Sequence, residues 1–386
     1  MRVASNSTSC RVCGSVLVKN GRTAAGTQRW RCVSCRAGTT RRRLDLSRRH
    51  ELEAFLGWLL GKDTQAEAGL GPDRSFRRVT AWCWNIAPEI PATGEVHDEV
   101  QLDGIYLGGW CALIATAGEH VIGWQWCDTE KSAAWAALLE RFPAPRVVVC
   151  DGGAGLASAL RKVWPETRVQ RCLVHVHRNV RTHLTHRPRL EAGRALLRLS
   201  KALMRLKTAE EAAAWATALN DWHTRWGPML KQRTHRGEAG AAPSWVKPSQ
   251  QWWYTHKRLR AAYYLLERLV KAGTLFTHLA PEHEDLRIAS TTNRIEGGVN
   301  AQLRLLLKHH RGMSENHMKR AVEWWLYTHS ENPAPAQRLI RPEHSEPPKR
   351  TPTTTEEERI GPALYDTATT AEEGLWARTG RAGRSR

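Results

Sequence analysis

The clearest pattern of hydrophobic and polar positions begins near residue 98. Three short apolar segments, bounded by glycines and by a Glu-His pair, predict three strands joined by hairpins. Helical periodicity and further strand patterns then alternate. In chain order, the predicted strands are 98–107, 110–117 and 120–127, and they are followed by helix 131–142, strand 146–150, helix 154–163 and strand 168–172.

The segment 146–150 (RVVVC) is an unbroken β-branched run, which is typical of a strand buried on both faces. Three antiparallel strands followed by helix–strand units give the order βββαβαβ. This order predicts an α/β protein with a ribonuclease H-like catalytic domain. We assign residues 93–175 to the first part of that core.

Helical periodicity dominates the next part of the chain, in the stretches 188–206, 208–226 and 255–272. We therefore predict a large all-helical insertion over 176–285, and a final helix of the core over 286–330. Residues 331–386 hold nine basic and nine acidic residues and few apolar ones. This composition predicts a disordered tail.

Two helical patterns precede the core, at 50–62 and 74–86, with Gly69 and Gly71 between them. A helix, a short glycine turn and a basic helix suggest a helix-turn-helix within a helical segment 46–92. DNA recognition and simple helix packing both explain this pattern.

Charge favours a polyanionic partner. The formal net charge is +20, and residues 1–50 hold twelve Lys or Arg but only one acid, Asp45. Nucleic acid explains this cluster better than a membrane surface, because the charges have no apolar partner face. No apolar run approaches a membrane span, and no apolar leader core begins the chain, so we expect a soluble intracellular protein.

Four of the nine cysteines form two knuckles, Cys10-x-x-Cys13 and Cys32-x-x-Cys35, with 18 residues between them. Each knuckle places two thiolates within reach of one ion at about 2.3 Å, so together they predict a structural Zn²⁺ site. Redox chemistry is the alternative, but paired knuckles outside a βαβ setting disfavour it. We assign residues 1–45 to a zinc ribbon.

The ribbon places Arg29, Trp30 and Arg31 on a predicted strand just before the second knuckle. Arginine can contact phosphate, and tryptophan can stack on bases. We interpret the ribbon as a DNA-contacting module; a protein–protein module is the alternative.

Two aspartates are candidate metal ligands. Asp103 lies among apolar residues of the first predicted strand, and Asp151 directly follows the buried strand 146–150. In the assumed fold these strands are neighbours, so both carboxylates meet at one edge of the sheet. Hard oxygen ligands suit Mg²⁺ or Mn²⁺. The alternative for each aspartate is a turn or capping residue, and Asp151-Gly152-Gly153 alone is more often a turn; the pair on this fold reverses that weighting.

A third ligand is expected from the segment STTNRIEGGVNAQLR, where Glu296 lies early in a predicted helix. Ser290 to Asn293 offer capping groups before it, and Gly297 and Gly298 follow it. Glycines inside a helix cost about 1 kcal/mol each, which suggests that something approaches the backbone closely here. Taken alone, Glu296 is better explained as an acid that complements the helix dipole.

The segments DGGAGLASALRKVWPETRVQRCLVHVHRNV and STTNRIEGGVNAQLRLLLKHHRGM resemble Mutator-type transposases of bacterial insertion sequences, in particular the actinobacterial type with an N-terminal zinc ribbon. The resemblance covers about residues 8–330. It implies that Asp103, Asp151 and Glu296 form the catalytic triad. It also implies that Cys172-x-x-His175 is the short Cys–His motif near the active site; a buried cysteine with a helix-capping histidine is the alternative.

What the resemblance implies is a DDE-type transposase that cleaves and joins DNA at the ends of an insertion sequence. Two Mg²⁺ or Mn²⁺ ions, roughly 3.5–4 Å apart, would bridge the triad. The partner would be double-stranded DNA, bound by a homodimer or larger assembly in the bacterial cytoplasm, at the nucleoid. The family's insertion also carries a functional tryptophan, for which this chain offers Trp215, Trp222, Trp226, Trp245, Trp252 and Trp253.

A basic helix over 299–320 is expected to follow the phosphate backbone, although a solvated helix face is the alternative. Its cations are Arg304, Lys308, His309, His310, Arg311, Lys319 and Arg320. Two other functions fit the same residues: a ribonuclease H-like structure-specific nuclease, and a catalytically silent DNA-binding regulator derived from a transposase.

Overall fold

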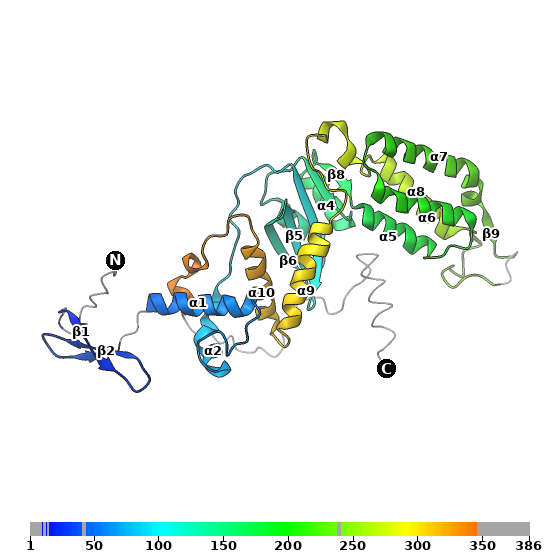
Figure 1. Ribbon diagram of the computed structural model, residues 1–386. Helices are drawn as coiled ribbons and strands as arrows, with labels where there is room; N and C mark the ends of the chain where they lie inside the picture. Colours follow the sequence, from blue (N-terminus) through cyan, green and yellow to red (C-terminus); the bar gives the residue numbers. More distant parts are fainter. Residues whose placement is uncertain (1–9, 11–12, 14, 41–43, 238–240, 346–386) are drawn as a thin grey trace. The chain divides into compact units, whose positions relative to one another are not determined.

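The computed structural model describes residues 10, 13, 15–40, 44–237 and 241–345 (Figure 1). The chain divides into two compact units. The first contains the described residues up to Ala87 together with 334–345, and the second contains Pro88–Pro333. None of the helices in the described part of the chain is long and apolar enough to cross a membrane.

The first unit begins with a three-stranded antiparallel sheet of order β1-β2-β3. Its strands are β1 (Leu17–Arg22), β2 (Gln28–Cys32) and β3 (Gly38–Thr39). Its apolar interior is small: Cys10, Leu17 and Cys32 are buried, and Trp30 and Ala37 pack against them. So small a core does not hold a domain together without a further link.

Helix α1 (Leu44–Leu60), helix α2 (Asp73–Thr80) and the 3₁₀ turn η1 (Ala81–Asn85) follow. Aromatic rings join them: Phe55 meets Trp84 at 4.7 Å and Trp58 meets Phe76 at 5.3 Å between ring centroids. The first helical pattern was predicted over residues 50–62, but the backbone is already helical from Leu44. The helix-turn-helix assignment stays a prediction.

Residues 336–345, within the predicted tail, form two 3₁₀ helices, η6 (Ala336–Leu339) and η7 (Pro342–Ser345). The amide of Asn85 donates to the carbonyl of His344 at 3.1 Å, so this segment packs on the first unit. The prediction of disorder from residue 331 onward is therefore wrong for residues 336–345. The remainder of the predicted tail, 346–386, lies outside the described residues.

A five-stranded mixed sheet forms the centre of the second unit, in the order β6-β5-β4-β7-β8. Strands β4, β5 and β6 are antiparallel, whereas β7 and β8 run parallel to β4. The strands are β4 (Glu99–Leu107), β5 (Trp110–Ala117), β6 (His120–Cys127), β7 (Val147–Cys150) and β8 (Arg168–Arg171). All four residues of β7 are buried, as its β-branched run requires.

Helices α3 (Ser132–Leu139) and α4 (Ala154–Val163) cover one face of this sheet. Their apolar side chains pack with Val100, Leu102, Val148 and Cys150 in one buried cluster. The elements thus follow the expected order βββαβαβ. Their assignment to the ribonuclease H-like fold stays a proposal.

The alternate residues of β4 face the other side, where three elements lie: η5 (Arg294–Val299), α9 (Asn300–His309) and α10 (Glu315–Thr328). The predicted continuous helix over 299–320 is wrong. Gly312, at φ +83°, breaks it, and the hydroxyl of Ser314 caps α10 by accepting from the amide of His317 at 3.3 Å. Residues 294–299 form a π-helical turn, a feature frequent at functional sites.

The insertion is a helical bundle with a β-hairpin. Its elements are α5 (Leu173–Leu184), α6 (Glu191–Ala202), η2 (Leu203–Arg205), α7 (Ala209–Lys231), β9 (Arg233–His235), β10 (Trp252–Tyr254), α8 (Lys257–Lys271), η3 (Thr277–Leu279) and η4 (Pro281–His283). The all-helical prediction is therefore wrong. Aromatic residues favour strands, and the run Trp252–Tyr254 pairs with β9.

Candidate active site

Asp103 and Asp151 occupy equivalent positions on neighbouring strands. Leu102 pairs with Cys150 in the parallel register of β4 and β7. The next residue on each strand path is an aspartate, and both lie on the side opposite the apolar cluster that holds Leu102 and Cys150. The two carboxylates therefore stand side by side at one edge of the sheet.

Electrostatics agree with their proximity. Burial, together with the charges of Asp151 and Glu296 and against the opposing effect of His175, raises the pKa of the Asp103 carboxyl to about 8. Acidic groups that repel one another in a partly buried site favour a cation as a common partner.

Glu296 reaches the same face of the sheet from the π-helical turn η5, which packs against β4. Its carboxylate accepts a short hydrogen bond from the guanidinium of Arg178 on α5. Among the described residues, the four ribbon cysteines are the set of ligand atoms within 4.8 Å of one another. The three carboxylates lie on one face of the sheet, but their oxygens are not all within 4.8 Å of one another.

The Cys–His motif fixes the start of the Glu296 segment. Cys172 is fully buried, and its sulfur accepts from both the amide and the hydroxyl of Thr292 at 3.4 Å. Burial raises the pKa of the Cys172 thiol, but hydrogen bonds from His175 and Thr292 outweigh burial and leave it below its ordinary value. Backbone pairing adds a further bond, from the Leu173 amide to the Ser290 carbonyl at 3.0 Å.

A buried glutamate on β4 fixes the other side of this segment. Glu99 accepts from the Ala289 amide, from the guanidinium of Arg294 at 3.3 Å, and from Gln101 at 2.8 Å. Side-chain capping by Ser290 to Asn293 was expected, but η5 has no side-chain cap. The segment is held by tertiary contacts instead, which a local pattern does not reveal.

Asn300, one turn after Glu296, is almost fully buried, and its amide donates to Asp103 at 2.8 Å. Its side-chain oxygen is buried with no hydrogen-bond partner among the described residues. This unpartnered oxygen and the three carboxylates beside it together form a set of hard donors, which suits Mg²⁺ or Mn²⁺. Sequence analysis missed Asn300, although its i+4 spacing from Glu296 places both on one helix face.

Arg171 braces the loop that follows Asp151. Its guanidinium donates to the Asp151 carbonyl and lies where a side chain at position 152 would project. Gly152 also has φ +80°, a backbone conformation that other residues rarely adopt. Glycine therefore suits both the backbone here and the nearby guanidinium. The Asp151 carboxylate accepts from the Gly153 amide at 2.8 Å. The loop geometry thus presents Asp151 in one orientation.

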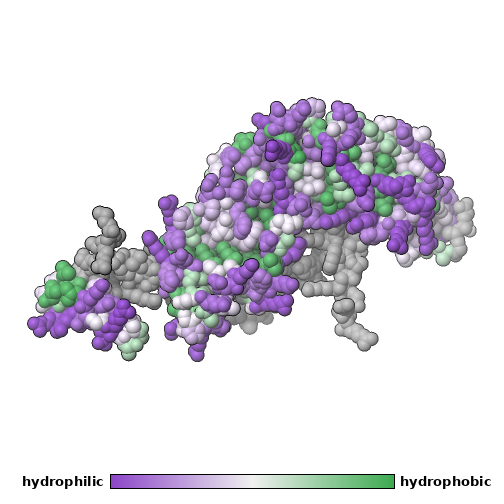
Figure 2. Space-filling view, in the orientation of Figure 1, coloured by the Kyte–Doolittle hydropathy of each residue, from purple (hydrophilic) through white to green (hydrophobic). Residues whose placement is uncertain are grey.

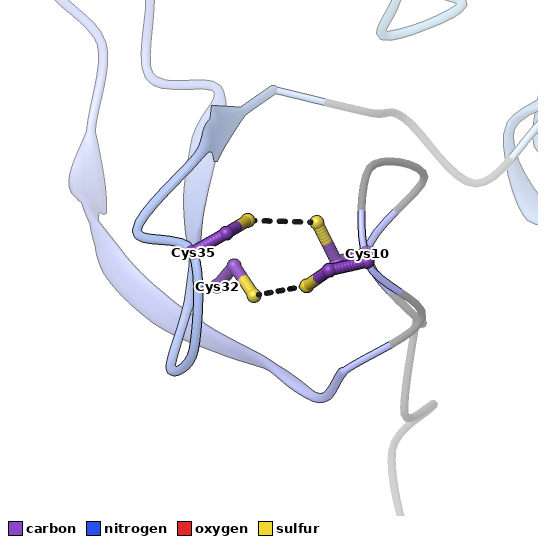
Figure 3. A group of neighbouring side chains, drawn as sticks. Cys10, Cys32 and Cys35 are labelled. Carbon is purple, nitrogen blue, oxygen red and sulfur yellow. Dashed lines mark hydrogen bonds between the residues drawn. The ribbon is translucent and has the colours of Figure 1, made fainter.

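The four ribbon cysteines form the predicted cluster, and Figure 3 shows Cys10, Cys32 and Cys35 converging. Sulfur separations are 3.5 Å for Cys10–Cys35 and 3.4 Å for Cys13–Cys32, and all four sulfurs lie within 4.8 Å. Four thiolates bound at about 2.3 Å would have similar spacing, so the set fits a zinc ion. Hydrogen bonds with Ser15, and then with Cys32 and Cys35, lower the pKa of Cys13 to about 6, whereas hydrogen bonds with Cys13 and Cys10 raise the pKa of Cys35, so Cys13 loses its proton first.

The predicted DNA contacts of the ribbon lie on different faces of β2. Arg29 and Arg31 are exposed, whereas Trp30 is half-buried against the small ribbon core. The arginines remain candidates for phosphate contact. Trp30 alternates with the two arginines along the strand, so its side chain points to the opposite face and packs against the ribbon core.

The predicted basic face after Glu296 is smaller than expected. Arg304, Lys308 and Arg311 are exposed. Lys319 instead lies over the ring of Trp110 at 3.1 Å, and Arg320 pairs with Glu323. Lys319 thus packs α10 on the sheet, and Arg320 is used in an ion pair within α10.

The candidate tryptophans of the insertion separate by burial. Trp215, Trp222 and Trp253 are buried, and the first two donate to the carbonyls of Leu199 and Ala192. Trp245 is 46% exposed, and Trp226 and Trp252 are half-buried. Trp226, Trp245 and Trp252 are therefore the candidates that solvent, and hence a ligand, can reach.

Comparison with known proteins identifies relatives of this chain. Residues 111–241 match the family described as "Transposase, Mutator family". A transposase for insertion sequence element IS905 of Lactococcus lactis is 26% identical over 117 residues, 29% of this chain and 28% of that protein. A transposase for element ISRM5 of Rhizobium meliloti is 28% identical over 173 residues, 43% and 41% of the two chains.

A probable transposase of Corynebacterium diphtheriae is 30% identical over 83 residues, 20% of this chain and 24% of that protein. The chain thus spans less than half the length of each of these three relatives. The predicted relationship to Mutator-type insertion-sequence transposases is confirmed. The family match encloses Asp151, Cys172 and His175 but neither Asp103 nor Glu296.

Proposed function

We propose that this chain is a DDE-type transposase, which binds the ends of an insertion sequence and cleaves and transfers DNA strands with Asp103, Asp151 and Glu296. The observation that supports it best is the common register of Asp103 and Asp151 on β4 and β7, with Glu296 on the same face. This arrangement occurs in a chain related to insertion-sequence transposases.

The three carboxylates and the side-chain oxygen of Asn300 would hold one or two Mg²⁺ or Mn²⁺ ions. Such ions, when bound, activate the attacking oxygen and stabilise the leaving one. The protein's part is to orient the ligands: Asn300 holds Asp103 and Arg171 holds the Asp151 loop, whereas Arg178 pairs with Glu296 and would compete with an ion for it.

Two reactions would use this site. In the first, water attacks phosphorus at the element end, the bond to the 3′ oxygen breaks, and a free 3′-hydroxyl remains. In the second, that hydroxyl attacks a target phosphodiester, forms the new bond and releases the target's own 3′-hydroxyl. No covalent protein–DNA intermediate is required. Ion binding would also displace Arg178 from Glu296, or share the carboxylate with it.

DNA would be bound by charge on several elements. The exposed Arg29 and Arg31 of the ribbon, and Arg304, Lys308 and Arg311 near the active site, are placed to contact phosphate. The ribbon's zinc ion would be structural, because four thiolates close it to solvent. Assembly of two chains or more on the paired ends belongs to the same proposal.

The test uses the purified chain and DNA that carries the two ends of the insertion sequence, with Mg²⁺ or Mn²⁺ and with target plasmid. We expect cleavage at the ends followed by joined products. Cleavage without joining would make the chain a structure-specific nuclease. Tight end binding with no cleavage would make it a regulator. Either result would overturn the proposal.

A further inference from the structure

The hairpin of the insertion and the residues that flank it are strongly basic. Residues 231–260 contain seven Lys or Arg and a single acid, Glu238, which lies outside the described residues. The hairpin lies at the end of the bundle, next to α7 and α8 (Figure 1). Hydrophilic side chains predominate over the insertion on the face shown in Figure 2. From the sequence, Trp245, Trp252 and Trp253 of this segment were candidates for the functional tryptophan of the insertion, but its cations were given no role.

Three of these seven cations are used within the fold. Arg236 donates to the carbonyls of Gln250 and Lys247. Arg258 donates to the carbonyls of His183 and Thr182, at the end of α5. Arg260 donates to the carbonyl of Leu230 and stacks on Tyr254 at 4.0 Å. These residues hold the hairpin on the bundle and do not need a further partner.

Two other cations are exposed and supported by aromatic rings. The guanidinium of Arg233 lies over the ring of Trp252 at 4.1 Å. The ammonium of Lys257 lies over Trp245 at 4.0 Å, and that ring is itself 46% exposed. Within the described residues, no carboxylate forms an ion pair with either cation. A ring beneath a cation restricts its conformations, so less entropy is lost when a ligand binds.

We propose that this surface, defined by Arg233, Lys257, Trp245 and Trp252, together with the exposed Lys247, binds the phosphate backbone of duplex DNA. The inference rests on the proposed function, which supplies long duplex DNA as substrate. Cations without a carboxylate partner, Arg233 on the hairpin and Lys257 at the start of α8, are complementary to the phosphates of duplex DNA. The surface would extend the DNA path beyond the carboxylates and would add affinity without sequence preference.

The experiment measures the affinity of the full chain for a 40-base-pair duplex of arbitrary sequence, without chelator and without added Mg²⁺ or Mn²⁺, over a series of salt concentrations. The variant is R233Q/K257Q. Its matched control is R198Q/K201Q, which removes two exposed cations from α6 of the same bundle. Thermal unfolding of each variant is compared with wild type, and no change is expected because all four side chains are exposed.

We expect R233Q/K257Q to bind roughly tenfold more weakly near 100 mM salt, with a slope of log affinity against log salt that is smaller by about two, since each phosphate contact contributes about 0.9. The control should keep most of the wild-type slope. A third variant, W245L, keeps the charge and should lower affinity without changing the slope.

Equal losses in R233Q/K257Q and R198Q/K201Q would show that only net charge matters, and would overturn this surface while leaving the proposed function standing. Unchanged binding by R233Q/K257Q would do the same. Failure of the wild-type chain to bind duplex DNA would instead overturn the proposed function itself.

Discussion

Arg178 on α5 donates to the carboxylate of Glu296, the acid that the π-helical turn brings to the sheet. Helix α5 also contains His175, and Cys172 at its start holds Thr292. One helix therefore both positions the third acid of the site and neutralises it in the metal-free chain. A metal ion and Arg178 would then compete for the same carboxylate.

We predict that Arg178→Gln lowers the Mn²⁺ concentration needed for half-maximal binding. The side chains of Arg178 and Glu296 are 37% and 30% exposed, so solvent weakens their pairing. Exposed pairs contribute about 0.2–1 kcal/mol, which corresponds to a change of roughly two- to fivefold. Calorimetric titration with Mn²⁺ measures this change.

Arg181→Gln, one turn further along α5, removes the same charge without touching Glu296 and is the control. If Arg178→Gln instead weakens Mn²⁺ binding, Arg178 orients Glu296 and does not compete for it.

A second prediction concerns Cys172. Cys172→Val keeps the site apolar, with a slightly larger side chain, but removes the acceptor for Thr292, so the position of the Glu296 segment should become less precise. We expect cleavage to fall on the order of tenfold while duplex binding without added Mg²⁺ or Mn²⁺ stays unchanged, since a misplacement of about 1 Å can cost up to a hundredfold. Cys172→Ser, which retains an acceptor, should recover much of the rate. Equal rates for the Val and Ser variants would show that this sulfur serves packing alone.

The third prediction is that the chain binds one zinc ion through Cys10, Cys13, Cys32 and Cys35. The buried apolar core of the ribbon is too small to fold without it. Metal analysis should give one zinc per chain for wild type and for Ser34→Ala, and none for Cys10→Ser/Cys32→Ser. Strong chelators should make residues 17–40 sensitive to protease. A ribbon that stays resistant after zinc removal would contradict this.

Ribbon charge supports a fourth prediction. Deleting residues 1–50 would cut into α1, so the clean variant is Arg29→Gln/Arg31→Gln, which changes only exposed side chains of β2. We expect the salt dependence of binding to element ends to weaken by a slope of about two. Lys19→Gln/Arg22→Gln on β1 removes equal charge and is the control. End binding unchanged at 150 mM salt would assign the ribbon another role.

Much of the catalytic unit could be predicted because its elements have strong local patterns. The β-branched run 146–150 and the hairpin glycines fix strands to within a residue, and strands 110–117 and 120–127 match β5 and β6. Asp103 and Asp151 could be placed from strand logic, because a parallel register brings strand ends together. The knuckle spacing similarly predicts the cysteine cluster.

What could not be predicted depends on contacts between distant segments. Arg178 lies 118 residues from Glu296 along the chain, and Glu99 lies 195 residues from Arg294. No local periodicity indicates such pairs. The hairpin Arg233–Tyr254 was missed because its strands are three residues each, too short to show alternation. The break at Gly312 was overlooked because the charges on both sides suggested one continuous basic face.

The last prediction concerns Glu296 itself, the acid whose assignment depends most on its place in the fold. Glu296→Gln keeps the shape and can still accept a hydrogen bond from Arg178, but it removes the charge that would hold metal. We therefore expect folding and duplex binding to be nearly unchanged, and cleavage with Mg²⁺ or Mn²⁺ to fall on the order of a thousandfold.

The structure also supplies the controls for Glu296→Gln. Glu315 is 52% exposed at the start of α10, 3.8 Å from Lys319, so Glu315→Gln should cleave normally. Glu323 accepts from Trp126 at 3.0 Å and pairs with Arg320, and therefore Glu323→Gln should lower the unfolding temperature before it affects cleavage. Near wild-type cleavage by Glu296→Gln, together with loss of cleavage in a stably folded Glu315→Gln or Glu323→Gln, would show that the third acid lies on α10 and that η5 has another purpose.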